Sequence, residues 1–210
     1  MKFSKITSQF AVATASAALL AGCASSGVKN PSGTGVTEMR ADEKGFVAGT
    51  GVESQDLVRV SDKIARGILG APQIANAATP PVVALDPVLN ETRFPINKNI
   101  FLDRIQAHLL SKAAGKVTFI ARERMATLER EREAKRTGQV TSNSDARVQE
   151  FKGADYFLTG KLSGLSTAAR GGVSDYILYT FQLINARSGE IVWGGDDEIK
   201  KQGVSDAVYR

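Results

Sequence analysis

The chain has 210 residues, of which 27 are Lys or Arg and 22 are Asp or Glu, so its net charge is +5. Because acidic residues are interspersed among the basic ones, this weak positive balance argues against a nucleic-acid partner. One cysteine and one histidine cannot form a disulfide or a metal site built on those residue types. We expect no metal, no cofactor and no small-molecule substrate.

The first 22 residues have the pattern of a secretion signal. Two lysines near the start precede an apolar run at 10–21, which is too short for a membrane-spanning helix of about 20 apolar residues. The run ends in a sequence that resembles the lipobox of bacterial lipoproteins: Leu20, Ala21, Gly22 and Cys23. We predict that the chain is cut before Cys23 and held on a membrane by lipid on its thiol.

A polar segment follows this cysteine. Residues 24–45 are mostly Ser, Gly, Thr and charged residues, which is typical of a flexible linker. Fully extended it spans at most about 75 Å, and its root-mean-square reach is about 25 Å. The predicted organisation is a signal peptide at 1–22, a lipidated tether at 23–45 and one folded domain at 46–210.

Four helices are predicted in the domain. The first begins at Ser54 as N-cap, has an apolar stripe at intervals of three and four, and ends at Gly70. Residues 73–81 are predicted to form a loop. A second helix is expected at 99–114, a third at 122–136 with Met125 and Leu128 facing inward, and a short one at 145–151.

The predicted strands are short in the first half of the domain and longer at its end. Runs at 82–88 and 117–121 alternate with the helices, whereas 155–166, 176–186 and a strand from 190 follow one another through turns. One parity of the middle strand is wholly apolar and is predicted to face the core: Ile177, Tyr179, Phe181 and Leu183. The fold class is therefore α/β, one domain with a mixed sheet, a C-terminal antiparallel meander and helices packed on its faces.

The residues that could support chemistry have simpler interpretations. His108 is predicted to be a boundary residue of its helix rather than a base or ligand. Adjacent strand residues point to opposite faces, so the carboxylates at 196–198 cannot converge on one substrate or cation. Asn90 and Thr92 match a glycosylation sequon but are better explained as a turn, and Gly171 is assigned to a hairpin tip.

Four local sequences resemble the LpoB family, lipoprotein activators of penicillin-binding proteins. They are GTGVESQDL at 49–57, DPVLNET at 86–92, GADY at 153–156 and SGEIVW at 188–193. The last two also suit a wider set of periplasmic domains that includes the curli secretion lipoprotein and the amino-terminal domain of TolB. The first one favours LpoB.

This resemblance implies a protein without enzymatic activity that binds a bifunctional class A penicillin-binding protein and stimulates peptidoglycan synthesis. Ala24 replaces the aspartate that commonly retains lipoproteins on the inner membrane, so we expect anchoring in the outer membrane, on its periplasmic side. The charged face of the helix at 122–136 is either simply solvated or a docking face. If it docks, the candidate contacts are Glu129, Arg132 and Arg136.

One alternative belongs to another class of protein, an envelope secretion or assembly component related to the curli secretion lipoprotein. Such a protein would need several amphipathic strands of about 9–11 residues to enter a membrane. Only the strand at 176–186 shows that length and alternation, and the core requires its apolar face.

Overall fold

The computed structural model describes residues 30–141 and 151–203, and the chain divides into two compact units between Glu38 and Met39. The predicted signal peptide, lipobox and lipidated Cys23 lie outside the described residues, as does the predicted helix at 145–151 except for its last residue. No helix within the described ranges is long and apolar enough to cross a membrane. In the first unit, a turn forms where Ser32 N and Thr37 Oγ1 donate to Asn30 Oδ1.

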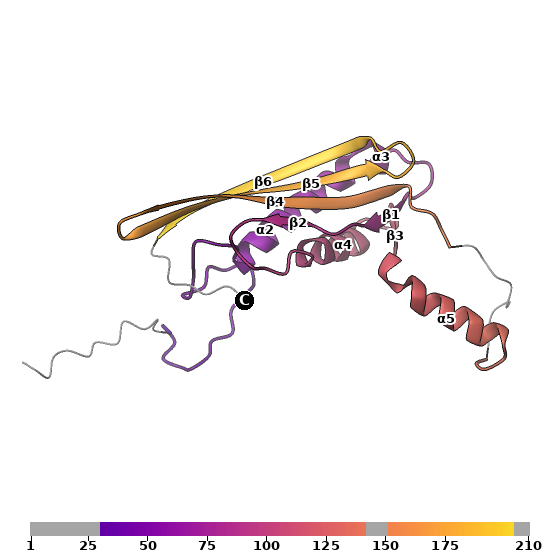
Figure 1. Cartoon of the computed structure of the whole chain (residues 1–210), viewed down its shortest axis with the longest axis horizontal. Coiled ribbons are helices and arrows are strands. Elements are labelled where there is room, and N and C mark those ends of the chain that lie inside the picture. The colour runs from indigo at the N-terminus through magenta and orange to yellow at the C-terminus, as the bar shows by residue number, and fades with distance from the viewer. Residues whose placement is uncertain (1–29, 142–150, 204–210) are drawn as a thin grey trace, which may run out of the picture. The chain divides into compact units, whose positions relative to one another are not determined.

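The second unit contains a six-stranded mixed sheet in the order β3-β1-β4-β5-β6, with β2 paired to β4 beside this path (Figure 1). β1 pairs in parallel with β3 and β4, and β2 pairs in parallel with β4. β4, β5 and β6 form the predicted antiparallel meander, so the predicted fold class is confirmed. The strands are β1 (Val82–Leu85), β2 (Leu89–Glu91), β3 (Thr118–Ile120), β4 (Tyr156–Ala169), β5 (Gly172–Asn185) and β6 (Ile191–Gly203).

The strand bounds differ from the prediction in two places. The strand predicted at 82–88 ends at Leu85, shortly before Pro87, which has no N–H to continue a ladder, and β2, which follows it, was not predicted. The meander strands have 14, 14 and 13 residues, longer than predicted. The end of β4, the start of β5 and the end of β6 contain small and charged residues. They lack the alternation of apolar and polar residues that predicts a strand.

The first helix, α2 (Ser54–Gly70), is capped by Glu53 rather than by Ser54. The Glu53 side chain accepts from the backbone N–H of Asp56, and the Asp56 carboxylate accepts from Glu53 N at 2.9 Å, which completes a capping box. The second long helix is α4 (Ile100–Lys112). The start of the segment predicted as a loop belongs to the one-turn helix α3 (Pro72–Ala75), with its proline at the first position where the missing N–H costs nothing.

The predicted third helix is a 3-10 turn, η1 (Arg122–Arg124), followed by α5 (Met125–Arg136). The prediction that Met125 and Leu128 face inward is wrong, because Met125 is only half-buried and Leu128 is 42% exposed. Indeed α5 has no buried residue. Two apolar side chains on an otherwise charged helix supply too little apolar surface to seat it on the core.

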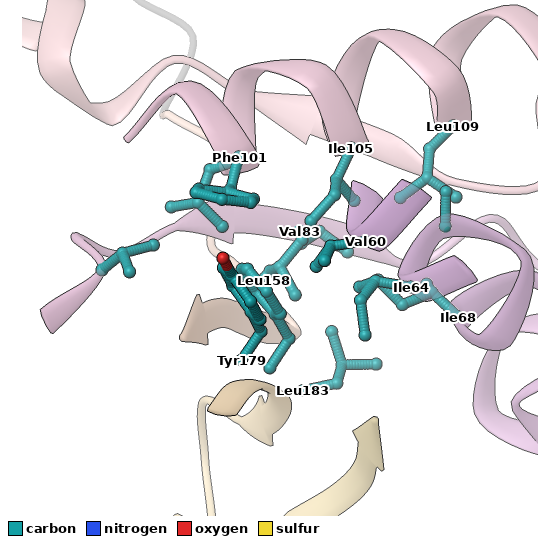
Figure 2. Close-up of a cluster of buried hydrophobic side chains, with 14 of the residues drawn as sticks. Val60, Ile64, Ile68, Val83, Phe101, Ile105, Leu109, Leu158, Tyr179 and Leu183 are labelled. Atoms are coloured by element: carbon teal, nitrogen blue, oxygen red, sulfur yellow. The ribbon is translucent and has the colours of Figure 1, made fainter. Parts of the chain in front are cut away.

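The core lies between one face of the sheet and α2 and α4, which pack side by side (Figures 1 and 2). The predicted apolar parity of β5 is confirmed, since each of its four residues is at most 2% exposed. Phe101 of α4 meets the rings of Tyr179 and Phe181 at centroid distances of 5.5 and 6.1 Å. The predicted stripe of α2 enters the same cluster through Val60, Ile64 and Ile68.

Three glycines allow large rings to approach the backbone closely. A Cβ added to Gly160 would lie 2.6 Å from the Phe181 ring, and one added to Gly67 would lie 2.6 Å from the Trp193 indole. Gly195 makes a similar contact with that indole on its own strand. The glycine on α2 therefore lets the helix lie directly against β6.

Candidate functional site

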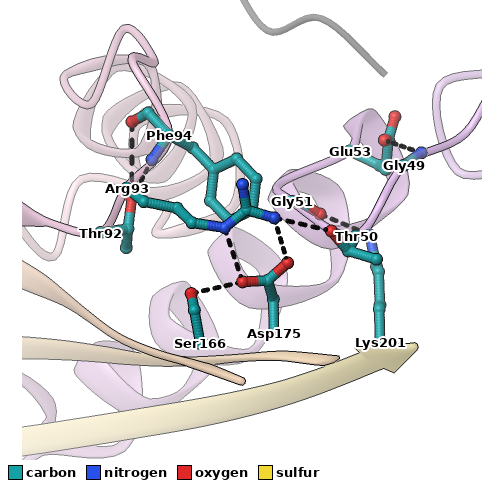
Figure 3. A network of polar contacts seen from close by, with 10 residues as sticks. All are labelled: Gly49, Thr50, Gly51, Glu53, Thr92, Arg93, Phe94, Ser166, Asp175 and Lys201. Carbon is teal, nitrogen blue, oxygen red and sulfur yellow. Dashed lines mark hydrogen bonds and ion pairs between the residues drawn. The ribbon is translucent and has the colours of Figure 1, made fainter. Parts of the chain in front are cut away.

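A buried ion pair joins β5 to the loop after β2 (Figure 3). Arg93 Nε and Nη2 donate to the two oxygens of Asp175 at 2.8 and 2.6 Å, and Nη2 also donates to Thr50 Oγ1 at 3.2 Å. Ser166 Oγ of β4 donates to the same carboxylate. The Asp175 side chain is 1% exposed and that of Arg93 is 42% exposed. The Asp175 carboxylate is thus buried, while the Arg93 side chain is partly exposed.

The environment of Asp175 favours its ionised form. The hydrogen bonds from Arg93 are the largest influence and hold the pKa of this carboxyl well below its usual range. Burial acts in the opposite direction, and the bonds with Ser166 and Thr50 act with Arg93. Asp175 is therefore ionised at any pH at which the domain is expected to work.

A second buried pair lies beside the first. Lys201 Nζ of β6 donates to the Asp56 carboxylate and to the carbonyl of Gly51. Glu53 accepts from Gly49 N at 2.9 Å, so the segment before α2 is fixed at several points. Within the sequence 49–57, Thr50 accepts from Arg93, the residue after 86–92, and Asp56 pairs with Lys201. One of the sequences that resemble LpoB is therefore joined to β6 and to the residue that follows another.

The sequon residues form the predicted turn. Thr92 N and Oγ1 donate to Asn90 Oδ1 at 3.1 and 2.7 Å, and Asn90 Nδ2 donates to the carbonyl of Phe94 at 2.8 Å. The turn presents Arg93 to Asp175. Its role is structural, and it positions the buried ion pair.

The predicted boundary position of His108 is confirmed. Its Nδ1 lies 3.2 Å from Asp62 of α2, and its side chain is 20% exposed, so it is a boundary residue between the two long helices. Arg104 approaches the same carboxylate at 3.6 Å. The three residues link the outer surfaces of α2 and α4.

The carboxylates at 196–198 lie inside β6 and diverge, as predicted. Asp197 points toward the helices, where Arg59 and Lys63 contact it at 3.0 and 3.2 Å. Glu198 points to the other face and accepts from Tyr176 Oη at 2.7 Å. Across residues 30–141 and 151–203, no three His, Cys, Asp or Glu side chains gather as a metal site.

The three candidate partner-contact residues on α5 differ in the contacts that they already make within the chain. The Arg132 guanidinium lies 3.6 Å from the ring centroid of Phe151, and Arg136 pairs with Glu133 at 2.7 Å. Glu129 is exposed and forms no ion pair with any described residue. A role for the three in partner binding stays a prediction.

Sequence reasoning missed the buried network. Its members looked like ordinary loop and strand residues, yet one signal was present. Asp175 continues the parity of Ile177 and Tyr179, so the pattern places a carboxylate on the buried face of β5. A buried carboxylate requires a cation or several hydrogen-bond donors, so this pattern predicts a partner close to Asp175.

Comparisons with known proteins identify one family. The family model described as peptidoglycan-synthase activator LpoB matches residues 56–199. No curated protein matches the chain.

Several solved structures are similar to the chain. The LpoB C-terminal domains from Salmonella enterica and Escherichia coli are 17% and 21% identical, with TM-scores of 0.41 and 0.42. Each alignment covers 70% of this chain and 99% of the other. Lipoprotein GNA1162 from Neisseria meningitidis is 18% identical over 59% of this chain and 84% of its own, with a TM-score of 0.36.

Proposed function

Since this chain belongs to the LpoB family of peptidoglycan-synthase activators, we propose that it is an outer-membrane lipoprotein that binds and activates a bifunctional class A penicillin-binding protein. The family match over residues 56–199 is the observation that supports this proposal, because it includes nearly all of the two long helices and of the sheet. The regulator acts by contact. The ionic groups of its described network serve to hold segments of the domain together.

Activation should be measurable with purified components. Alone, the protein should leave lipid-linked peptidoglycan precursor and purified cell wall unchanged. Added to its bifunctional penicillin-binding protein, it should raise the rate of glycan polymerisation and saturate with one binding constant. Hydrolysis of wall material by the protein alone would contradict the regulator role. Failure to bind any penicillin-binding protein would favour a secretion or assembly component instead.

The tether should matter only in the cell. Deleting 27–38 leaves the compact unit from Met39 intact and shortens the link to Cys23. Activation in solution should persist, whereas activation in the envelope should be lost because the domain no longer reaches an inner-membrane enzyme. An unchanged cellular effect would show that reach is not limiting.

The anchor has its own test. The Cys23→Ser variant lacks the thiol that takes the lipid, so radiolabelled palmitate should enter the wild-type protein only. The variant should accumulate as the uncut precursor. Equal labelling of both proteins would contradict lipidation at Cys23.

A further inference from the structure

The two edges of the sheet differ greatly in length. β3 has three residues, whereas β6 has 13. Among the described strands, β6 pairs with β5 alone, so one row of its backbone groups faces outward. A long open edge is a template for a further strand.

One hydrogen bond shows which residues of β6 face outward. Arg59 Nη2 of α2 donates to the carbonyl of Glu198 at 3.1 Å. Because the N–H and C=O of one strand residue point the same way, Glu198 and, by alternation, Lys200 turn their backbone groups to the open edge.

The helix α2 runs along β6 in the opposite direction. Near its start Asp56 binds Lys201, and near its end Gly67 lies against Trp193. Between these points Arg59 and Lys63 both contact Asp197. These contacts hold the solvent-exposed side of α2, here called its outer face, beside the open edge of β6.

That outer face is basic. Arg59, Lys63 and Arg66 follow at intervals of four and three, so they lie in one row on the helix. The first two side chains are each 54% exposed, and Arg66 is exposed and forms no ion pair within the described part of the chain. A single carboxylate, that of Asp197, opposes three cations, which leaves the row positively charged.

We propose that β6 and α2 form a docking site for an extended acidic segment of a partner protein. The segment adds to the sheet as a strand beside β6, and its carboxylates on the helix side meet Arg59, Lys63 and Arg66. Arg59 then exchanges the carbonyl of Glu198 for a carboxylate of the incoming strand. This goes beyond the proposed function, because it names the chemistry of the bound segment whichever enzyme is activated.

A synthetic peptide tests the proposal on the full chain, purified in mild detergent. The probe is a short peptide of alternating Glu and Val, titrated by calorimetry against a Lys-Val counterpart and against the Glu-Val peptide with alternate backbone amides methylated. The acidic peptide should bind saturably and the basic one should not. Methylation should weaken binding by more than about tenfold, because it removes several backbone hydrogen bonds.

Two pairs of variants locate the site. Lys200→Pro removes an outward N–H and should abolish binding, whereas Lys200→Ala, which removes the same charge, should retain most of it. Arg66→Glu should weaken binding about fivefold, and Lys116→Glu, on an exposed residue just before β3, should not. If the proline variant fails to fold, the Arg66 and Lys116 pair and the methylated peptide remain decisive.

Two different results would contradict the proposed docking site. Equal affinity for methylated and unmethylated peptides would mean that the cations attract any anion, a bilayer included, and would overturn strand addition. Absence of saturable binding by the acidic peptide would overturn the site itself. Neither result would affect activation of a penicillin-binding protein, which is measured separately.

Discussion

Replacing Arg93 with alanine should lower the free energy of unfolding by about 3–5 kcal/mol, because the buried carboxylate of Asp175 would lose its cation. The loss is a large part of the roughly 5–15 kcal/mol that stabilises a typical domain. Urea unfolding followed by the fluorescence of Trp193, the only tryptophan in the chain, measures it.

The partner substitution should cost less. In Asp175→Asn the amide still accepts a hydrogen bond, and the Arg93 side chain, which loses only the charge of Asp175, is 42% exposed and can be hydrated. We expect about 1–3 kcal/mol for this change. Equal losses in the two variants would contradict the asymmetry of burial.

The same carboxylate predicts a dependence on pH. Its pKa is lower in the folded domain than the value near 3.9 of an unfolded chain. The stability it contributes is therefore complete above about pH 4 and is lost as the pH falls further, toward the folded pKa. Asp175→Asn should flatten the decline in unfolding free energy below pH 4. A decline as steep as that of the wild type would assign the acid sensitivity to other carboxyls.

The Phe181→Ala variant should be destabilised by about 3–5 kcal/mol. Phe181 is fully buried, meets the ring of Phe101 and lies against Gly160, whose missing side chain leaves the ring in direct contact with the backbone. Truncation leaves a cavity between sheet and helix that rigid backbone cannot close. Thermal or urea unfolding gives the magnitude.

Thr180→Ala is the matched control on the opposite face of the same strand. Thr180 is half-buried, and its hydroxyl donates to the carbonyl of Lys161 at 3.2 Å. Loss of that one bond should cost about 1 kcal/mol. Similar losses at both positions would mean that the two faces of β5 contribute equally to the core.

Periodicity predicted the parts of the fold that bury apolar surface. The stripe of α2 and the core face of β5 could be predicted because their core side chains are apolar and recur at the spacing of a helix or a strand. α5 was predicted as a helix, but the prediction that Met125 and Leu128 face the core was wrong. The rule that holds for the longer stripe of α2 does not hold for two isolated apolar residues.

The network around Arg93 could not be predicted in the same way. Arg93 and Asp175 are separated by 82 positions in the chain, and Asp56 and Lys201 by 145 positions. A single sequence gives no indication of which cation pairs with which carboxylate. The cap of α2 was missed for a local reason. Ser54 is a common cap residue, but Glu53 forms a reciprocal box with Asp56 that leaves Ser54 inside the helix.

The contacts between glycines and rings limit how this sequence can change during evolution. A methyl group at position 67 or 195 would overlap the indole of Trp193, so neither glycine can be replaced while a ring of that size remains there. The three positions are therefore expected to change together, with a smaller side chain at 193 preceding any larger one at 67 or 195. Such epistasis ties the spacing of a helix and its neighbouring strand to one aromatic residue.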